Sequence, residues 1–258
     1  MRRADPVRTV ENDRLSVRVY ATRHDMGAAA ADHAAGHLRA ATAGRGRARV
    51  VFASAPSQVE FLAALVNAAD IDWGRVTAFH LDEYLDLPPR APQAFGQFLR
   101  AHLFDRVRPG TVSLLDGAAA DARAEAERYA RLLSAAPLDV ACVGIGENGH
   151  LAFNEPGAAD FDDPDQVRIV TIDERSRAQQ VHDGCFARVN DVPTRALTLT
   201  VPAIMRAAAV TCIVPGPTKR EALRRMVRGP VSTECPASVL RSHPAAVVFA
   251  DVEAAADL

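Results

Sequence analysis

The sequence predicts an α/β fold in which one doubly wound, mainly parallel sheet carries helices on both faces. Short apolar, β-branched segments that are typical of buried strands recur along the chain. Segments with helical periodicity separate them, and this alternation indicates βαβ units. No internal repeat, low-complexity linker or change of composition interrupts the 258 residues. We therefore expect a single domain over residues 1–258.

The N-terminal half of the chain contains four predicted strands and four predicted helices. Residues 1–13 are polar and are expected to be flexible, whereas the apolar–polar alternation of residues 15–20 predicts a strand. Asp25 is expected to cap an alanine-rich helix that ends near residue 42. Ser57 is expected to cap the next helix, because Glu60 follows at the capping-box spacing. The other predicted elements are strands 47–53, 75–80 and 112–114 and helices 94–103 and 120–133.

The C-terminal half continues the same alternation. Residues 138–143 form an apolar segment that predicts a buried strand, and a glycine-rich loop follows it. The other predicted elements are strands 167–172, 197–201, 210–214 and 245–250 and helices 175–184 and 220–227. The complete order predicts a three-layer, Rossmann-like architecture.

Composition and charge exclude several classes of function. Hydrophobic residues make up 48% of the chain and charged residues 24%, as in an ordinary globular protein. A formal net charge of −2 gives no electrostatic basis for binding nucleic acid or an anionic membrane. No apolar stretch approaches the length of a membrane span. Residues 1–5 contain two arginines but precede no apolar segment, so we expect no secretory signal and a cytoplasmic location.

Cysteine usage gives no indication of a metal centre or of a disulfide framework. The four cysteines are widely spaced and form no C-x-x-C pair. Cys142 and Cys212 fall inside predicted strands, where a buried thiol packs as a small hydrophobic group. We therefore expect neither a metal nor a disulfide.

The loop at residues 144–157 carries the strongest functional signal. Three glycines fall within six residues directly after a predicted strand, and glycine lets the backbone turn tightly and approach a ligand. The same loop contains His150, Glu147 and Glu155. A second predicted strand ends in Asp82-Glu83-Tyr84. Ligands of open α/β sheets bind at the carboxyl ends of the strands, so both segments are expected to line one cleft.

Three stretches together resemble the glucosamine-6-phosphate deaminase (isomerase) family: Phe79-His80-Leu81-Asp82-Glu83-Tyr84, residues 144–156 and Gly216-Pro217-Thr218-Lys219. Their order, spacing and position at strand ends match across about residues 15–250. The most specific part is Gly-His-Leu-Ala-Phe-Asn-Glu-Pro at residues 149–156. The related 6-phosphogluconolactonases share the fold but lack its Phe-Asn-Glu-Pro ending. The resemblance implies conversion of glucosamine 6-phosphate and water to fructose 6-phosphate and ammonia in amino-sugar catabolism.

The resemblance also implies roles for the acid–base residues, without a metal or organic cofactor. His150 exchanges a proton with the ring oxygen when the sugar ring opens, a task that suits imidazole. Asp82 removes the C2 proton and returns it to C1 through an enolamine. Glu155 orients and polarises His150. Asn148 occupies a position at which many members of the family have aspartate.

The substrate-binding residues depart from the family in two places. Lys219, at a Gly-Pro turn before a helix, is expected to contact the phosphate. A Gly- and Thr-rich phosphate loop is replaced by residues 52–58, and an arginine on a later helix is replaced by His182. Residues expected to bind the substrate are Ser54, Ser57, Gln58, Gly146, His182 and Lys219. These departures indicate that the chemistry is kept while the anionic end of the substrate is recognised differently.

Several alternatives remain open from the sequence alone. Another amino-sugar phosphate would also explain the altered phosphate loop. A lactonase or a simple isomerase with the same fold is a further alternative, and the Phe-Asn-Glu-Pro ending argues against the lactonase. A non-catalytic sugar-phosphate sensor would have no need of Asp82, His150 and Glu155 together. Homo-oligomers are common in the family, but the sequence does not fix their size.

Overall fold

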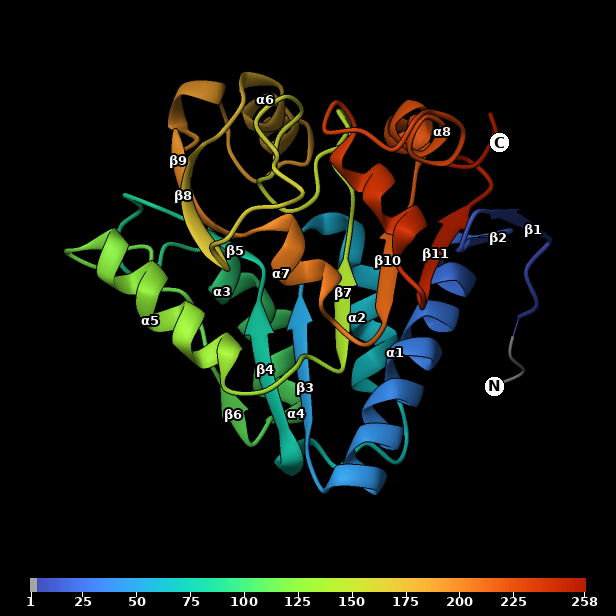
Figure 1. Ribbon diagram of the computed structural model, residues 1–258, viewed down its shortest axis with the longest axis horizontal. Helices are drawn as coiled ribbons and strands as arrows, with labels where there is room; N and C mark the ends of the chain where they lie inside the picture. The colour runs from blue at the N-terminus through green and yellow to red at the C-terminus, as the bar shows by residue number, and fades with distance from the viewer. Residues whose placement is uncertain (1–3) are drawn as a thin grey trace.

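The computed structural model describes residues 4–258 and centres on an eight-stranded sheet (Figure 1). The strand order is β1-β2-β11-β10-β7-β3-β4-β6, and every neighbouring pair is parallel except β1 and β2. The prediction of a mainly parallel sheet is therefore confirmed. The strands are β1 (Arg8–Asn12), β2 (Leu15–Tyr20), β3 (Ala48–Phe52), β4 (Val76–His80), β6 (Thr111–Val112), β7 (Val140–Val143), β10 (Val210–Val214) and β11 (Ala246–Asp251).

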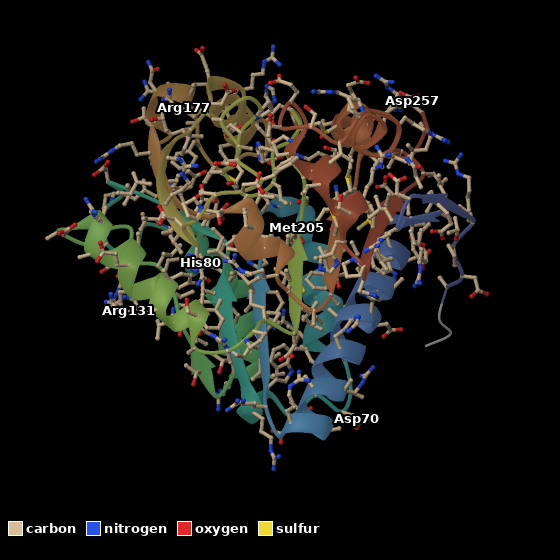
Figure 2. All side chains as sticks on the ribbon, in the orientation of Figure 1. Asp70, His80, Arg131, Arg177, Met205 and Asp257 are labelled. Carbon is tan, nitrogen blue, oxygen red and sulfur yellow. The ribbon has the colours of Figure 1, made fainter. Side chains whose placement is uncertain are left out.

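Helices surround this sheet and bury both of its faces. The helices on the sheet are α1 (Arg23–Arg45), α2 (Val59–Val66), α3 (Phe95–Leu99), α4 (Asp105–Val107), α5 (Ala122–Ser134), α7 (Val201–Met205) and α8 (Arg220–Arg228), whereas α6 (Glu174–His182) packs outside the two clusters that cover it. Successive residues of a strand enter different hydrophobic clusters: Val50 packs in one and Val51 in the other. Because side chains alternate across a strand, these two clusters are the two covered faces of the sheet. Figure 2 shows His80 in the interior and Arg131 and Asp70 at the periphery.

A second, antiparallel sheet of three strands lies beside the end of β4. Its order is β5-β9-β8, with β5 (Asp82–Tyr84), β9 (Arg195–Leu199) and β8 (Val167–Thr171). The sequence predicts β8 and β9 as further strands of the main sheet, but they lie in this second sheet. In β8 only Val167 is buried and Ile169 is 39% exposed, so this strand lacks the two covered faces of a strand inside the parallel sheet. This small sheet places Asp82 within a strand rather than in a loop.

The structure corrects several local expectations. Residues 8–12 form β1 and pair with β2, so this part of the N-terminus is ordered, while residues 1–3 lie outside the described chain. The cap of α1 is Thr22, whose hydroxyl accepts from the backbone N–H of Asp25. Ser57 lies inside the short 3₁₀ turn Pro56–Gln58, and its hydroxyl accepts from Gln58 Nε2 instead of capping α2.

No helix within residues 4–258 combines the length and the hydrophobicity needed to cross a membrane.

Candidate active site

The carboxyl ends of four neighbouring strands converge on the candidate site. In the order β10, β7, β3 and β4, they lead into residues 215–219, 144–157, 53–58 and 81–84. One pocket is lined by residues from three of these segments. Among the residues singled out from the sequence, it contains Ser54, Ser57, Gln58, Asp82 and His150.

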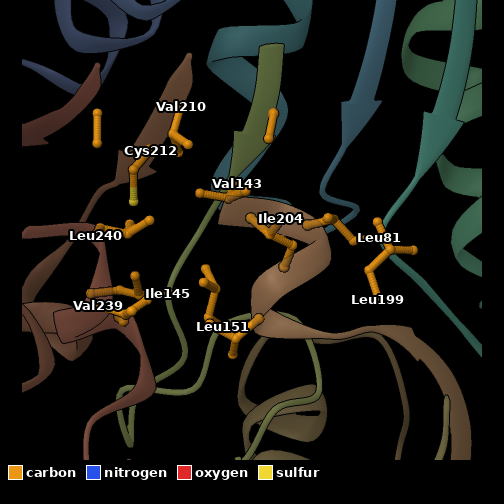
Figure 3. Packing of buried hydrophobic residues seen from close by; sticks show 14 of the residues in the cluster. Leu81, Val143, Ile145, Leu151, Leu199, Ile204, Val210, Cys212, Val239 and Leu240 are labelled. Atoms are coloured by element: carbon orange, nitrogen blue, oxygen red, sulfur yellow. The ribbon is translucent and has the colours of Figure 1, made fainter. Parts of the chain in front are cut away.

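The 144–157 loop is held in place by its own backbone and by β9. The N–H of Gly146 donates to the carbonyl of His150, and Phe153 N–H donates to Thr198 Oγ1. Asn154 Nδ2 donates to the carbonyls of Leu151 and Leu199. Figure 3 shows Ile145 and Leu151 among the buried apolar side chains beneath the loop. These contacts fix the position from which His150 projects.

Gly146 is required by the His150 ring. A Cβ atom at position 146 would lie 2.2 Å from Cε1 and 2.3 Å from Nδ1 of that imidazole. Its role in the structure is therefore to make room for the ring, and it does not line the pocket. Gly149 has φ +91°, and a Cβ there would lie 2.8 Å from Cys235 Sγ. Gly146 and Gly149 thus meet specific steric demands of this loop.

The His150 ring is oriented by two polar partners on its Nδ1 side. Ser176 Oγ of α6 lies 2.8 Å from Nδ1, and Glu155 Oε2 lies 3.4 Å from the same nitrogen. Asn148 joins the group, because its Nδ2 donates to Glu155 Oε2 and its Oδ1 accepts from the His150 backbone N–H. Neither Asn148 nor Glu155 lines the pocket, and both contact His150 instead.

The environment of Glu155 favours the charged carboxylate. Burial alone raises its pKa, but hydrogen bonds from His150, Ser176 and Asn148 and the charge of His150 outweigh burial and lower the pKa to about 2. In a neutral ring, the negative charge beside Nδ1 favours the tautomer with its proton on Nδ1. The Nε2 atom is then the one available for proton exchange.

The environment of Asp82, in contrast to that of Glu155, favours the protonated carboxyl group. Its side chain is buried, and burial together with the neighbouring charge of Glu83 raises its pKa to about 8. Glu83 is fixed beside it, because its carboxylate accepts from the backbone N–H groups of Tyr84, Phe95 and Gly96. A carboxyl group with such a pKa can both accept and return a proton near neutral pH.

The remaining two predicted residues lie outside the pocket lining. Lys219 is buried and forms no ion pair within residues 4–258. Burial lowers its pKa, and the charges of Asp183 and Glu147 partly oppose this effect. The His182 side chain is 64% exposed, and its Nδ1 lies 3.6 Å from Glu147 Oε2. The structure therefore directs His182 towards solvent and a carboxylate, not into the pocket.

Three residues of α6 were missed from the sequence. Ser176 contacts the histidine, and Gln179 and Gln180 line the pocket. Gln179 Oε1 also accepts from the backbone N–H of Glu147, which ties the helix to the loop. Their spacing places all three on one face of a helix, the only signal the sequence offered. Across the described residues 4–258, no group of three His, Cys, Asp or Glu side chains is arranged to hold a metal ion.

Comparisons with known proteins give a consistent pattern. The sequence profile of the glucosamine-6-phosphate isomerases/6-phosphogluconolactonase family matches residues 21–249. A glucosamine-6-phosphate deaminase of Bacillus cereus is 40% identical over 184 residues, which cover 71% of this chain and 68% of the relative. A deaminase of Bacillus thuringiensis is 39% identical over the same shares of each chain.

Solved structures extend the comparison to the whole fold. A monomeric glucosamine-6-phosphate deaminase superposes with a TM-score of 0.84 at 27% identity, covering 93% of this chain and 98% of that one. A 6-phosphogluconolactonase from Shewanella baltica gives a TM-score of 0.75 at 21% identity over 91% and 97%. The second likeness concerns the fold alone.

Proposed function

The chain belongs to the family of glucosamine-6-phosphate isomerases and 6-phosphogluconolactonases, and on that premise we propose that it is a glucosamine-6-phosphate deaminase. It converts D-glucosamine 6-phosphate and water to D-fructose 6-phosphate and ammonia. The observation that carries this proposal is the placement of Asp82 and His150, from two separate strand ends, in one pocket. The pKa of Asp82, raised to about 8, suits a proton that must be taken and then returned.

The reaction begins with opening of the sugar ring. His150 exchanges a proton with the ring oxygen, and the Glu155 charge beside its Nδ1 stabilises the protonated ring during this step. The open-chain substrate then has an aldehyde at C1 and an amino group at C2.

Proton transfer between two carbons follows. Asp82 removes the C2 proton, the electron pair of that bond forms the C1–C2 double bond, and the C1 carbonyl oxygen takes up a proton to become the hydroxyl group of an enolamine. Reprotonation at C1 by the same carboxyl group gives an imine at C2. Water adds to C2, the C–N bond breaks, and ammonia leaves with the ketose as the second product. One carboxyl group over one face of the planar intermediate serves both transfers.

The phosphate is expected to bind towards Lys219. This lysine is buried and has no carboxylate partner within 4 Å among residues 4–258. A buried ammonium group without a counter-ion is costly, and an anionic ligand would compensate it. A small-molecule amino-sugar phosphate is thus the partner that the site suits, in a cytoplasmic enzyme of amino-sugar catabolism.

The direct test is ammonia release by the purified protein. Glucosamine 6-phosphate, galactosamine 6-phosphate and unphosphorylated glucosamine are compared, with 6-phosphogluconolactone hydrolysis measured in parallel. We expect turnover of glucosamine 6-phosphate that is abolished in Asp82→Asn, while the variant still binds the substrate. Ammonia from galactosamine 6-phosphate alone would reassign the substrate, and lactone hydrolysis without ammonia would replace the proposal with a lactonase. Binding without any turnover would indicate a sensor.

A further inference from the structure

Two buried polar atoms in the pocket have no hydrogen-bond partner within residues 4–258. They are Gln58 Oε1 and Ser54 Oγ. Gln58 is 1% exposed and Ser54 is 6% exposed, and both side chains line the pocket that contains Asp82 and His150. Buried polar groups are almost always hydrogen-bonded, so two such atoms in one pocket indicate where a ligand supplies the missing partners.

The orientation of the Gln58 amide determines which kind of partner is missing. Its Nε2 lies 3.1 Å from Ser57 Oγ and 3.5 Å from the carbonyl oxygen of Ile213. A flipped amide would place Oε1 against that carbonyl, oxygen to oxygen. Nitrogen therefore faces the carbonyl, and the unpartnered atom is the oxygen.

An amide oxygen accepts hydrogen bonds and cannot donate one. A sugar hydroxyl group can satisfy it, whereas the oxygens of an ionised phosphate carry no proton to donate. Ser54 beside it can donate or accept, so the pair suits a hydroxyl group, which does both. The charge of the pocket agrees with this assignment, because His150 is the only lining side chain among the described residues that can carry a positive charge.

We propose that Gln58 and Ser54 form a hydroxyl-binding subsite that selects which amino sugar the enzyme accepts. This inference rests on the proposed amino-sugar substrate of the same pocket. It replaces the expectation that these residues hold the phosphate, which is left to Lys219. The hydroxyl in question is one that does not react, so its recognition determines specificity and leaves the proton transfers to Asp82 and His150.

A double-mutant cycle between protein and ligand tests this assignment. Binding is measured by calorimetry in the Asp82→Asn background, where turnover is blocked, with and without Gln58→Met. The ligands are glucosamine 6-phosphate, its 3-deoxy and 4-deoxy analogues, and unphosphorylated glucosamine. Gln166→Met is the matched control, because the Gln166 side chain lies outside the pocket and contacts Ser134 instead. Ser54→Ala is the second variant, and circular dichroism confirms that each variant is folded.

We expect Gln58→Met to weaken binding of glucosamine 6-phosphate at least tenfold and to leave one of the two deoxy analogues unaffected. Ser54→Ala should show its smallest effect on the same analogue. A loss that is equal for both deoxy analogues but disappears for unphosphorylated glucosamine would assign Gln58 to the phosphate and overturn the proposal. The proposal would also be overturned if Gln58→Met and Gln166→Met bound the ligands equally well, or if none of the ligands bound.

The test of the hydroxyl-binding subsite and the test of the proposed deaminase activity can succeed or fail independently. Ammonia release with no coupling between Gln58 and any hydroxyl would sustain the deaminase and remove the subsite. Coupling without ammonia release from the enzyme with native Asp82 would sustain the subsite and remove the deaminase.

Discussion

Substituting Asp82 by asparagine should make the protein more stable at alkaline pH than it is with the native residue. The pKa of Asp82 is raised from 3.8 to about 8. Between these values the unfolded chain releases a proton that the folded chain retains. The contribution of Asp82 to the free energy of unfolding is therefore fully present below about pH 4 and is lost as the pH rises towards 8. Asparagine cannot ionise, so the variant escapes this loss.

The size of this stability difference follows from the pKa shift of Asp82. Each pKa unit corresponds to about 1.4 kcal/mol, so roughly four units set a ceiling of about 6 kcal/mol above pH 8. Between pH 5 and pH 8 the difference in unfolding free energy between Asp82→Asn and the native protein should grow by about 4 kcal/mol. All other titrating groups are common to both proteins and cancel in this comparison.

Denaturant unfolding at pH 5, 6, 7 and 8 measures this difference. The fluorescence of Trp73, the only tryptophan of the chain, reports the transition. Asp162→Asn, at an exposed aspartate, is the matched control and should follow the native protein at every pH. If the curves for Asp82→Asn and the native protein remain parallel within about 0.5 kcal/mol over this range, the pKa of Asp82 is not raised and the reasoning fails.

Further predictions concern the activity. In the native enzyme kcat/KM should fall about tenfold per pH unit below pH 8, because the base is then protonated; a plateau down to pH 6 would contradict this. Ser176→Ala should lower kcat roughly 10- to 100-fold and displace the pH profile, with recovery in Ser176→Thr, and failure of threonine to rescue would argue against the hydroxyl. Gly146→Ala should lower kcat and shift the His150 ring resonances, since the methyl would meet the imidazole. Lys219→Met should raise KM for glucosamine 6-phosphate at least tenfold while unfolding stability stays equal or increases, because a buried unpaired charge is removed; an unchanged KM would place the phosphate elsewhere.

The sequence predicted the parallel strands of the main sheet, but neither β1 nor the strand partners of β8 and β9. Apolar runs identify β7 and β10 because both of their faces are buried. The same runs do not reveal which strand pairs with which, and β9 joins β5 and β8 through contacts far apart in the sequence. Hydrogen-bonding side chains are harder still, because a shared helix face does not reveal which partner a hydroxyl or amide group will meet. Ser176 became identifiable only when folding placed its hydroxyl 2.8 Å from His150 Nδ1.

Counting residue positions along the chain identified the correct helix, but the side chain it selected, His182, points away from the pocket. His182 ends α6 and points to solvent, while Gln179 and Gln180, one turn earlier, line the pocket. A turn of helix comprises 3.6 residues, so the two positions between Gln180 and His182 turn the side chain to roughly the opposite face. Sequence spacing fixes the helix, and only the structure fixes which face reaches the pocket.

The pKa values of two buried carboxyl groups, Asp82 and Glu155, are shifted in opposite directions, and this difference distinguishes the roles that the two groups can take. The environment of Asp82 holds its pKa near 8, so a proton can be gained or lost there at little cost near neutral pH. Glu155 accepts hydrogen bonds that hold its pKa near 2, so it stays charged throughout a catalytic cycle. A group with a fixed charge cannot shuttle a proton, but it can stabilise a neighbour that does. Asp82 is therefore the carboxyl group suited to transfer between C2 and C1, and Glu155 is the one suited to support His150.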